Sequence, residues 1–177
     1  MKIKYCFFII LLTIFLTSCF LVDTASIEGE GGTIPDEGGR DFTAEQTGAG
    51  LAYSMESVTV TGLTHTWAAD LIIKLTAPDG SNCELVNADG EKNDFNGDYT
   101  FVPYDADAPA LFEYDGREVY ENGVIIPQEL RSKGYLQNIL PSNIAGQWIL
   151  TVSDARAGDT GSFESFSIKI SYFKPWW

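Results

Sequence analysis

Alternation of apolar and polar residues limits this chain to a small set of folds. Every second residue is apolar in residues 71–75, in 148–152 and in 166–172, and no long run has a helical period. Such alternation places the apolar side chains on one face of a β-strand. Turn-forming segments such as Pro78-Asp79-Gly80-Ser81 separate the runs. About eight short strands joined in this way predict an all-β fold, an antiparallel β-sandwich of jelly-roll type.

The first residues have the composition of a secretory leader. Lys2 and Lys4 precede an apolar run over residues 5–16, which is too short to span a membrane as a helix. The run ends in Leu16-Thr17-Ser18-Cys19, which resembles a bacterial lipobox. We therefore expect residues 1–18 to be a lipoprotein signal peptide and Cys19 to be acylated, which would hold the protein in the cell envelope by a lipid anchor. An ordinary signal peptide with an incidental cysteine is the alternative.

The rest of the chain divides by composition. Residues 19–32 are rich in glycine and acidic residues, and are predicted to be a lipidated flexible stalk because they have little apolar surface to bury. Residues 33–174 are predicted to form the β-sandwich. Residues 175–177 form a C-terminal tail in which the sequence does not place Trp176 and Trp177.

Charge and cysteine content exclude several classes of protein. The formal net charge of −14 argues against nucleic acid as a partner and predicts repulsion from an anionic membrane unless the chain is tethered. Of the three cysteines, Cys6 lies in the leader and Cys19 is the expected lipidation site. Cys83 is then the single thiol of the mature chain, so no intrachain disulfide is expected. Its position in a predicted strand favours a small buried residue over a reactive one.

Two separated segments carry a family resemblance. The first contains His65-Thr66-Trp67 and Asp70-Leu71 and ends at Pro78 and Gly80; the second contains Gly146, Trp148, Leu150, Val152 and Asp154 and continues into Gly158-Asp159-Thr160-Gly161. Together they resemble the P domain (Homo B domain) of kexin-type proprotein convertases and bacterial subtilisin-like proteases. The resemblance covers roughly residues 33–174 and implies a jelly-roll domain that packs on a protease and stabilises it. Ala69 and Ala77 depart from the glycine and serine usual in the family.

No catalytic residue is predicted. His65 is the single histidine, and no Gly-x-Ser-x-Gly elbow occurs in the sequence. We expect His65 to be a packed, hydrogen-bonded structural residue. The protein is therefore predicted not to be an enzyme, although its family is linked to serine endopeptidases.

A structural calcium ion is a further hypothesis. Five aspartates fall at predicted strand edges, and Ca²⁺ takes oxygen ligands of this kind; they are Asp70, Asp105, Asp107, Asp154 and Asp159. The alternative is that these carboxylates accept turn hydrogen bonds from the backbone. Zinc is disfavoured, because one histidine and one free thiol do not make a zinc site.

The expected function is non-catalytic binding. Aromatic residues crowd the segment 99–135, where they suit contacts with carbohydrate or protein, although aromatics in strands are also ordinary core residues. We expect a cell-envelope lipoprotein that displays a binding or stabilising module for a protein or glycan partner. The alternative is an accessory P domain that acts in trans on a subtilisin-like protease.

Overall fold

The computed structural model describes residues 21–112 and 116–174, which form eleven strands and two 3₁₀ turns. Eight strands have six or more residues: β1 (Leu21–Ile34), β2 (Gly38–Gln46), β3 (Leu51–His65), β4 (Leu71–Thr76), β5 (Asn82–Asn87), β6 (Asp94–Val102), β10 (Gly146–Asp154) and β11 (Gly161–Lys174). The short elements are β7 (Tyr120–Glu121), β8 (Val124–Ile125), β9 (Glu129–Arg131), η1 (Ala68–Asp70) and η2 (Leu136–Asn138). Neither helical turn in this part of the chain is long enough to cross a bilayer.

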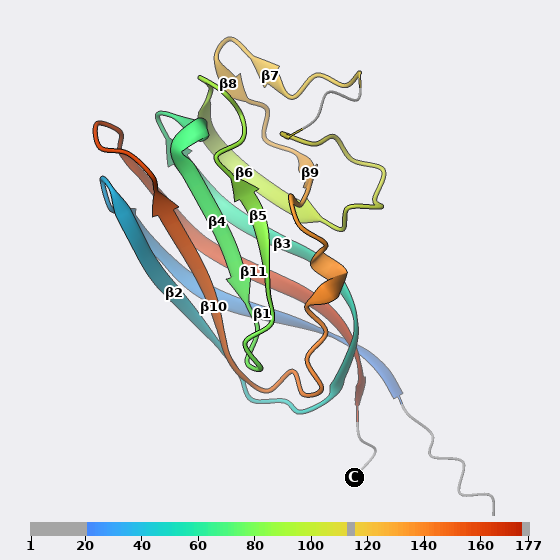
Figure 1. Cartoon of the computed structure of the whole chain (residues 1–177). Coiled ribbons are helices and arrows are strands. Elements are labelled where there is room, and N and C mark those ends of the chain that lie inside the picture. Colours follow the sequence, from blue (N-terminus) through green and yellow to red (C-terminus); the bar gives the residue numbers. More distant parts are fainter. Residues whose placement is uncertain (1–20, 113–115, 175–177) are drawn as a thin grey trace, which may run out of the picture.

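The strands form two facing sheets (Figure 1). One sheet has the order β1-β11-β3-β6-β8-β7, with β9 also paired to β6, and the other has the order β2-β10-β4-β5. All pairings among the eight long strands are antiparallel. Successive long strands mostly alternate between the sheets, so the fold is an antiparallel β-sandwich as the sequence predicts.

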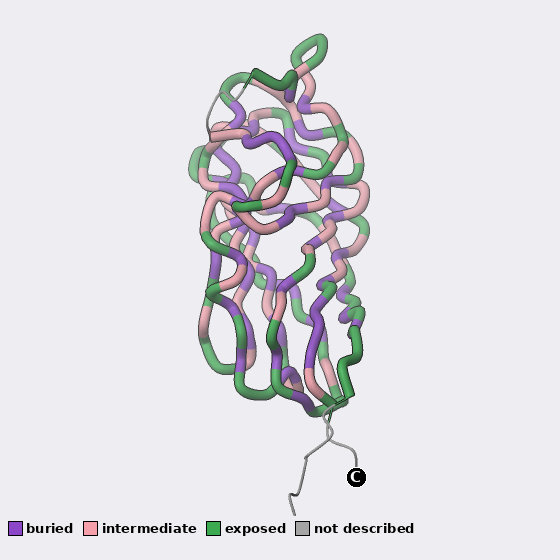
Figure 2. Tube along the Cα trace, turned by 90° about the vertical axis from the view of Figure 1, so that its right-hand side faces the viewer, coloured by how far each residue is buried: buried purple, intermediate pink, exposed green. Residues whose placement is uncertain are grey.

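The core lies between the sheets, where the alternating runs place their apolar side chains. Leu71, Ile73 and Leu75 of β4 are fully buried, and so is Trp148 of β10. The indole N–H of Trp148 donates to the backbone carbonyl of Ile144 at 3.0 Å, which satisfies the one polar atom of this side chain. Figure 2 shows the resulting alternation of buried and exposed positions along the strands. The predicted core faces are confirmed.

The strand count differs from the expected eight because of the segment between β6 and β10. There β7, β8 and β9 have two or three residues each, and both β8 and β9 pair parallel with β6. Such short pieces cannot establish an alternating pattern, so the sequence carries no signal for them. Their pairing depends on the edge of the sheet that β6 offers.

The predicted flexible stalk is wrong over residues 21–32. These residues belong to β1, which pairs with β11 from Leu21 to Ile34 and continues directly into the sandwich. A Cβ atom on Gly29 would overlap the Phe166 ring, so glycine here makes room for a core residue of the partner strand. A glycine-rich composition indicates flexibility, whereas in β1 glycine permits the close approach of two strands. The signal peptide, Cys19 and the 175–177 tail lie outside the described residues.

Candidate functional site

The family-like segments meet at one end of the sandwich, which we call the distal end. There β1 ends, β3 ends at His65 and β11 begins at Gly161, and these three strand ends are in register with one another. The start of β1 and the end of β11 lie at the opposite end of the molecule, which we call the basal end (Figure 1). The distal end therefore projects away from the points where the chain enters and leaves the domain.

A buried histidine–aspartate pair joins two strands at the distal end. The Nε2 atom of His65 lies 3.2 Å from Oδ2 of Asp154, and the two residues are 1% and 2% exposed. On the other side of the ring, Nδ1 lies 3.3 Å from the backbone nitrogen of Trp67 and 3.0 Å from its carbonyl oxygen. In the neutral ring Nε2–H donates to Asp154 and Nδ1 accepts from the Trp67 N–H. Both ring nitrogens are thus engaged, and the geometry agrees with the prediction of a packed, hydrogen-bonded His65.

The other two aspartates of the family-like segments lie near this pair. Asp70, in η1, is buried and has its Oδ1 3.7 Å from Nε of Arg156. The backbone N–H of Arg156 also donates to Oδ1 of Asp154 at 3.0 Å. Asp159 accepts a hydrogen bond from the Thr66 hydroxyl at 2.9 Å. Arg156, for which no role was predicted from the sequence, therefore contacts Asp70 through its side chain and Asp154 through its backbone.

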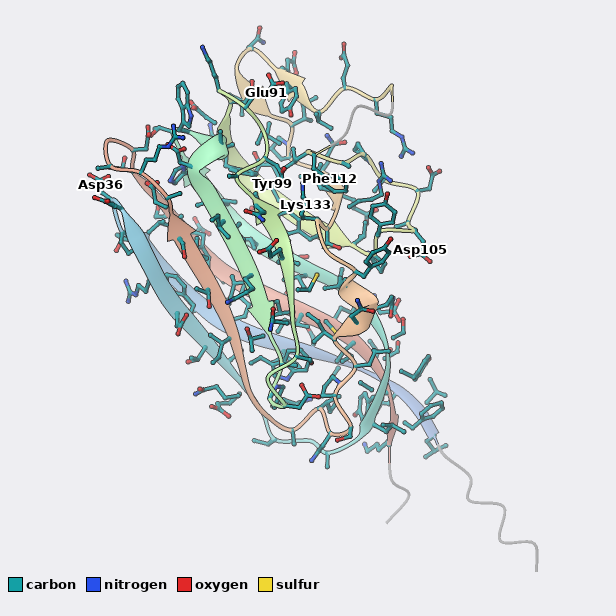
Figure 3. All side chains as sticks on the ribbon, viewed as in Figure 1. Asp36, Glu91, Tyr99, Asp105, Phe112 and Lys133 are labelled. Carbon is teal, nitrogen blue, oxygen red and sulfur yellow. The ribbon has the colours of Figure 1, made fainter. Side chains whose placement is uncertain are left out.

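Asp105 and Asp107 do not join this group. Asp107 pairs with Arg117 at 3.0 Å, and Asp105 borders a small pocket with Tyr135. Asp36 marks the distal end, because its Oδ1 accepts a hydrogen bond from the backbone N–H of Gly158 in the β10–β11 loop. Figure 3 shows Asp105 on the opposite side of the molecule from Asp36. In residues 21–112 and 116–174 no three His, Cys, Asp or Glu side chains gather as a metal site would require. The contacts of Asp154 are those of the alternative left open above, a carboxylate that accepts turn hydrogen bonds.

A pocket of about 450 Å³ opens beside the histidine–aspartate pair. We call it the distal pocket. His65 and Phe95 form part of its wall, and Asp94 adds a carboxylate. The rest of the lining is dominated by hydroxyl and amide side chains, namely Thr33, Thr64, Thr66, Asn96, Thr160 and Ser162. These residues come from four different strands and the loops beside them, so the sequence offered no local pattern by which to find them.

A second feature is an aromatic cluster on the side of the molecule around β9. The Tyr104 ring lies 6.1 Å from that of Phe112 and 5.1 Å from that of Tyr135. Arg131 lies over Tyr104 and Lys133 over Phe112, at 5.4 and 4.7 Å from the ring centres. Figure 3 shows Lys133 beside Phe112. The aromatics were noted from the sequence, but the packing of Arg131 and Lys133 on their rings was not predicted.

Other aromatics of this segment are core residues. Tyr99 and Phe101 are fully buried, and the Tyr99 hydroxyl donates to the carbonyl of Ile125 at 2.7 Å. Cys83 is buried as predicted, and burial raises the pKa of its thiol to about 12. A thiol in this state is not a nucleophile near neutral pH.

Comparison with protein families matches residues 55–170 to the proprotein convertase P-domain. No curated protein matches the chain. Among solved structures, the serine protease of Aeromonas sobria in complex with its chaperone is similar over 88% of this chain and 27% of that chain, at 16% identity and a TM-score of 0.49. The same protease solved without the chaperone is similar over 87% of this chain and 27% of that chain, at 16% identity and a TM-score of 0.48.

Proposed function

The chain belongs to the proprotein convertase P-domain family, and on that basis we propose that it is a non-catalytic binding module held in the cell envelope by an acylated Cys19. The family is an accessory domain that carries no catalytic machinery. The distal pocket is the observation that carries the proposal. It is the binding surface that the protein offers to a protein or glycan partner.

The position of the pocket supports this function. The distal pocket lies at the end of β3 and the start of β11, whereas β1 begins at the basal end only two residues after Cys19. A module tethered at Cys19 would therefore present the pocket away from the membrane. The pocket presents the apolar surface of Phe95, Val124 and the threonine methyl groups beside hydroxyl and amide groups, and such a mixed lining suits a peptide or a sugar.

The geometry of His65 argues against catalysis. A catalytic histidine needs one ring nitrogen directed at its nucleophile and the other at its orienting carboxylate. In His65 the carboxylate of Asp154 occupies one nitrogen and the Trp67 backbone the other. No nitrogen is left to accept a proton from a hydroxyl group. We therefore expect purified protein to lack peptidase activity.

A photo-crosslinking experiment tests the binding role. The Asn96→p-benzoylphenylalanine variant places the crosslinker in the distal pocket, on β6. The matched control is Thr100→p-benzoylphenylalanine, farther along the same strand and outside the pocket lining. After irradiation in intact cells we expect one protein captured from position 96 and not from position 100. Screening of the purified chain against envelope glycans, with an Asn96→Ala comparison, covers a glycan partner.

The outcomes separate the candidate partners. A subtilisin-like protease captured from position 96 would favour the accessory role in trans, whereas another protein or a glycan would favour an independent binding module. Equal capture from both positions, together with glycan binding that Asn96→Ala leaves unchanged, would refute a role for the distal pocket. Mass spectrometry of the mature protein tests the acylation of Cys19 separately.

A further inference from the structure

The large exposed hydrophobic residues gather at the basal end. Among the described residues six large apolar side chains are exposed, and four of them lie near the start of β1 or of β3. We call these four the basal patch: Val22 at 60% exposure, Leu51 at 47% and Tyr53 at 41% lie on the outer face of the sheet, and Leu21 at 57% is the first residue of β1 and points to its other face. Val22 and Leu51 both lie opposite Phe173 of β11, so they share a row across three hydrogen-bonded strands. The Tyr53 ring packs 4.8 Å from the Phe173 ring.

The outer face of the same strands is polar elsewhere. Glu28, Ser167, Thr59 and Thr100 form one such row across β1, β11, β3 and β6. The hydroxyl groups of Thr59 and Thr100 are hydrogen bonded to each other at 2.9 Å. An antiparallel sheet with one face in water normally carries polar residues there. The change to apolar residues is confined to the basal end, and it needs an apolar partner to explain it.

The position of Cys19 identifies that partner. Only Phe20 separates Cys19 from Leu21, the first residue of β1. Two residues span at most about 7 Å, so an acyl anchor on Cys19 would hold the basal patch at the level of the lipid headgroups. We propose that the basal patch rests on the bilayer surface and seats the domain upright on the membrane. This inference rests on the proposed acylation of Cys19.

Charge at the basal end is compatible with a lipid surface. The chain carries a formal net charge of −14. In the segments 21–24, 50–55 and 171–174, however, the charged residues are Asp23 and Lys174, whose side chains pair at 3.7 Å. These three segments, which carry the basal patch, are therefore neutral together and avoid the repulsion that the acidic remainder of the protein would meet at an anionic membrane. Tyrosine is also enriched at membrane interfaces, and the sequence after Lys174 supplies Trp176 and Trp177, a residue type with the same preference.

Site-specific fluorescence tests the contact. Val22→Cys in the basal patch and Glu28→Cys in the same strand give two exposed labelling sites about 20 Å apart along β1. Cys83 is buried and its thiol pKa is raised to about 12, so it should label slowly. Each variant carries an environment-sensitive fluorophore and is studied on phosphatidylcholine vesicles that contain nitroxide-labelled lipid. We expect the emission at position 22 to shift to the blue and fall by more than half, and that at position 28 to stay unchanged.

Two forms of the protein separate the two hypotheses, the acylation of Cys19 and the contact of the basal patch with lipid. One is the acylated protein purified from the envelope. The other is the chain from residue 19 onward with Cys19→Ser, tethered through an N-terminal histidine tag to a chelating lipid; it retains every described residue. If Cys19 proves not to be acylated but the tethered form still shows quenching at position 22, the anchor is wrong and the patch retains its affinity for lipid.

Equal, water-like emission from both labels on tethered vesicles would overturn the inference. So would a dimer in sedimentation that Val22→Glu abolishes, combined with no quenching by nitroxide lipid, because the patch would then bind a second copy of the chain. Val22→Glu changes an exposed side chain, so it should leave the melting temperature near that of the unmodified protein.

Discussion

The buried pair of His65 and Asp154 allows a sharp test of the distal end. Asp154→Ala removes the acceptor for the His65 Nε2–H and for the Arg156 N–H. The first of these donors is buried, whereas Arg156 lies at the surface and can bond to water. A buried donor left unsatisfied costs about 1–3 kcal/mol, and loss of the turn bond adds about 1 kcal/mol. We therefore expect a loss of about 3 kcal/mol in the free energy of unfolding.

Asp154→Asn should be tolerated much better. The amide oxygen still accepts from the Arg156 N–H, and the amide nitrogen faces Nε2 of His65. If the ring changes tautomer, Nε2 accepts from the new amide and Nδ1–H donates to the Trp67 carbonyl, which already lies 3.0 Å away. The Trp67 N–H then loses Nδ1 as its acceptor, but Trp67 is only half-buried, so the expected loss is about 1 kcal/mol.

Thermal melts and nitrogen NMR measure both effects. For a chain of this size we expect the melting temperature to fall by about 6–12 °C in Asp154→Ala and about 2–4 °C in Asp154→Asn. His65 is the single histidine, so its ring nitrogens give an unambiguous tautomer assignment in each protein. Asp41→Ala, an exposed residue on β2 that accepts from the Thr151 hydroxyl, controls for the change in net charge. Equal losses in the alanine and asparagine variants, or an unchanged tautomer in Asp154→Asn, would refute this reasoning.

Three further predictions concern the core, the thiol and calcium. Gly29→Ala should cost about 1–3 kcal/mol because its Cβ would meet the Phe166 ring, whereas Ser26→Ala on the exposed side of β1 should be neutral in the same denaturant titration. The thiol of Cys83 has a pKa near 9.0 in the unfolded chain and about 12 in the folded one, so unfolding releases a proton between these values. The stability advantage over Cys83→Ala should therefore shrink by about 1.4 kcal/mol per pH unit above pH 9.0 and be constant below it; a constant difference up to about pH 11 would contradict this. If calcium is a structural ligand, chelation lowers the melting temperature and added Ca²⁺ restores it; an unchanged melt with no metal in elemental analysis rules the ion out.

Much of the fold could be predicted because burial in a strand follows a local pattern. The alternation in β4 and β10 leaves little freedom of register, since a slip of one residue would turn Ile73 or Leu150 outward into water. The family-like segments placed His65 and Asp154 in one domain and suggested that strand edges carry the polar residues. The glycines of β1 misled the prediction, because the role of Gly29 depends on Phe166, a residue that lies 137 positions later in the chain.

The all-β class, the core faces of the long strands and membership in the P-domain family follow from the local pattern of residues. Which strand ends meet depends on tertiary contacts. These contacts joined His65 to Asp154 across 89 positions, separated Asp105 and Asp107 from the other aspartates, and gathered the distal pocket from strands far apart in the chain. The physical reason is that a strand's faces follow from its own period of two, whereas its neighbours and register depend on contacts with distant segments.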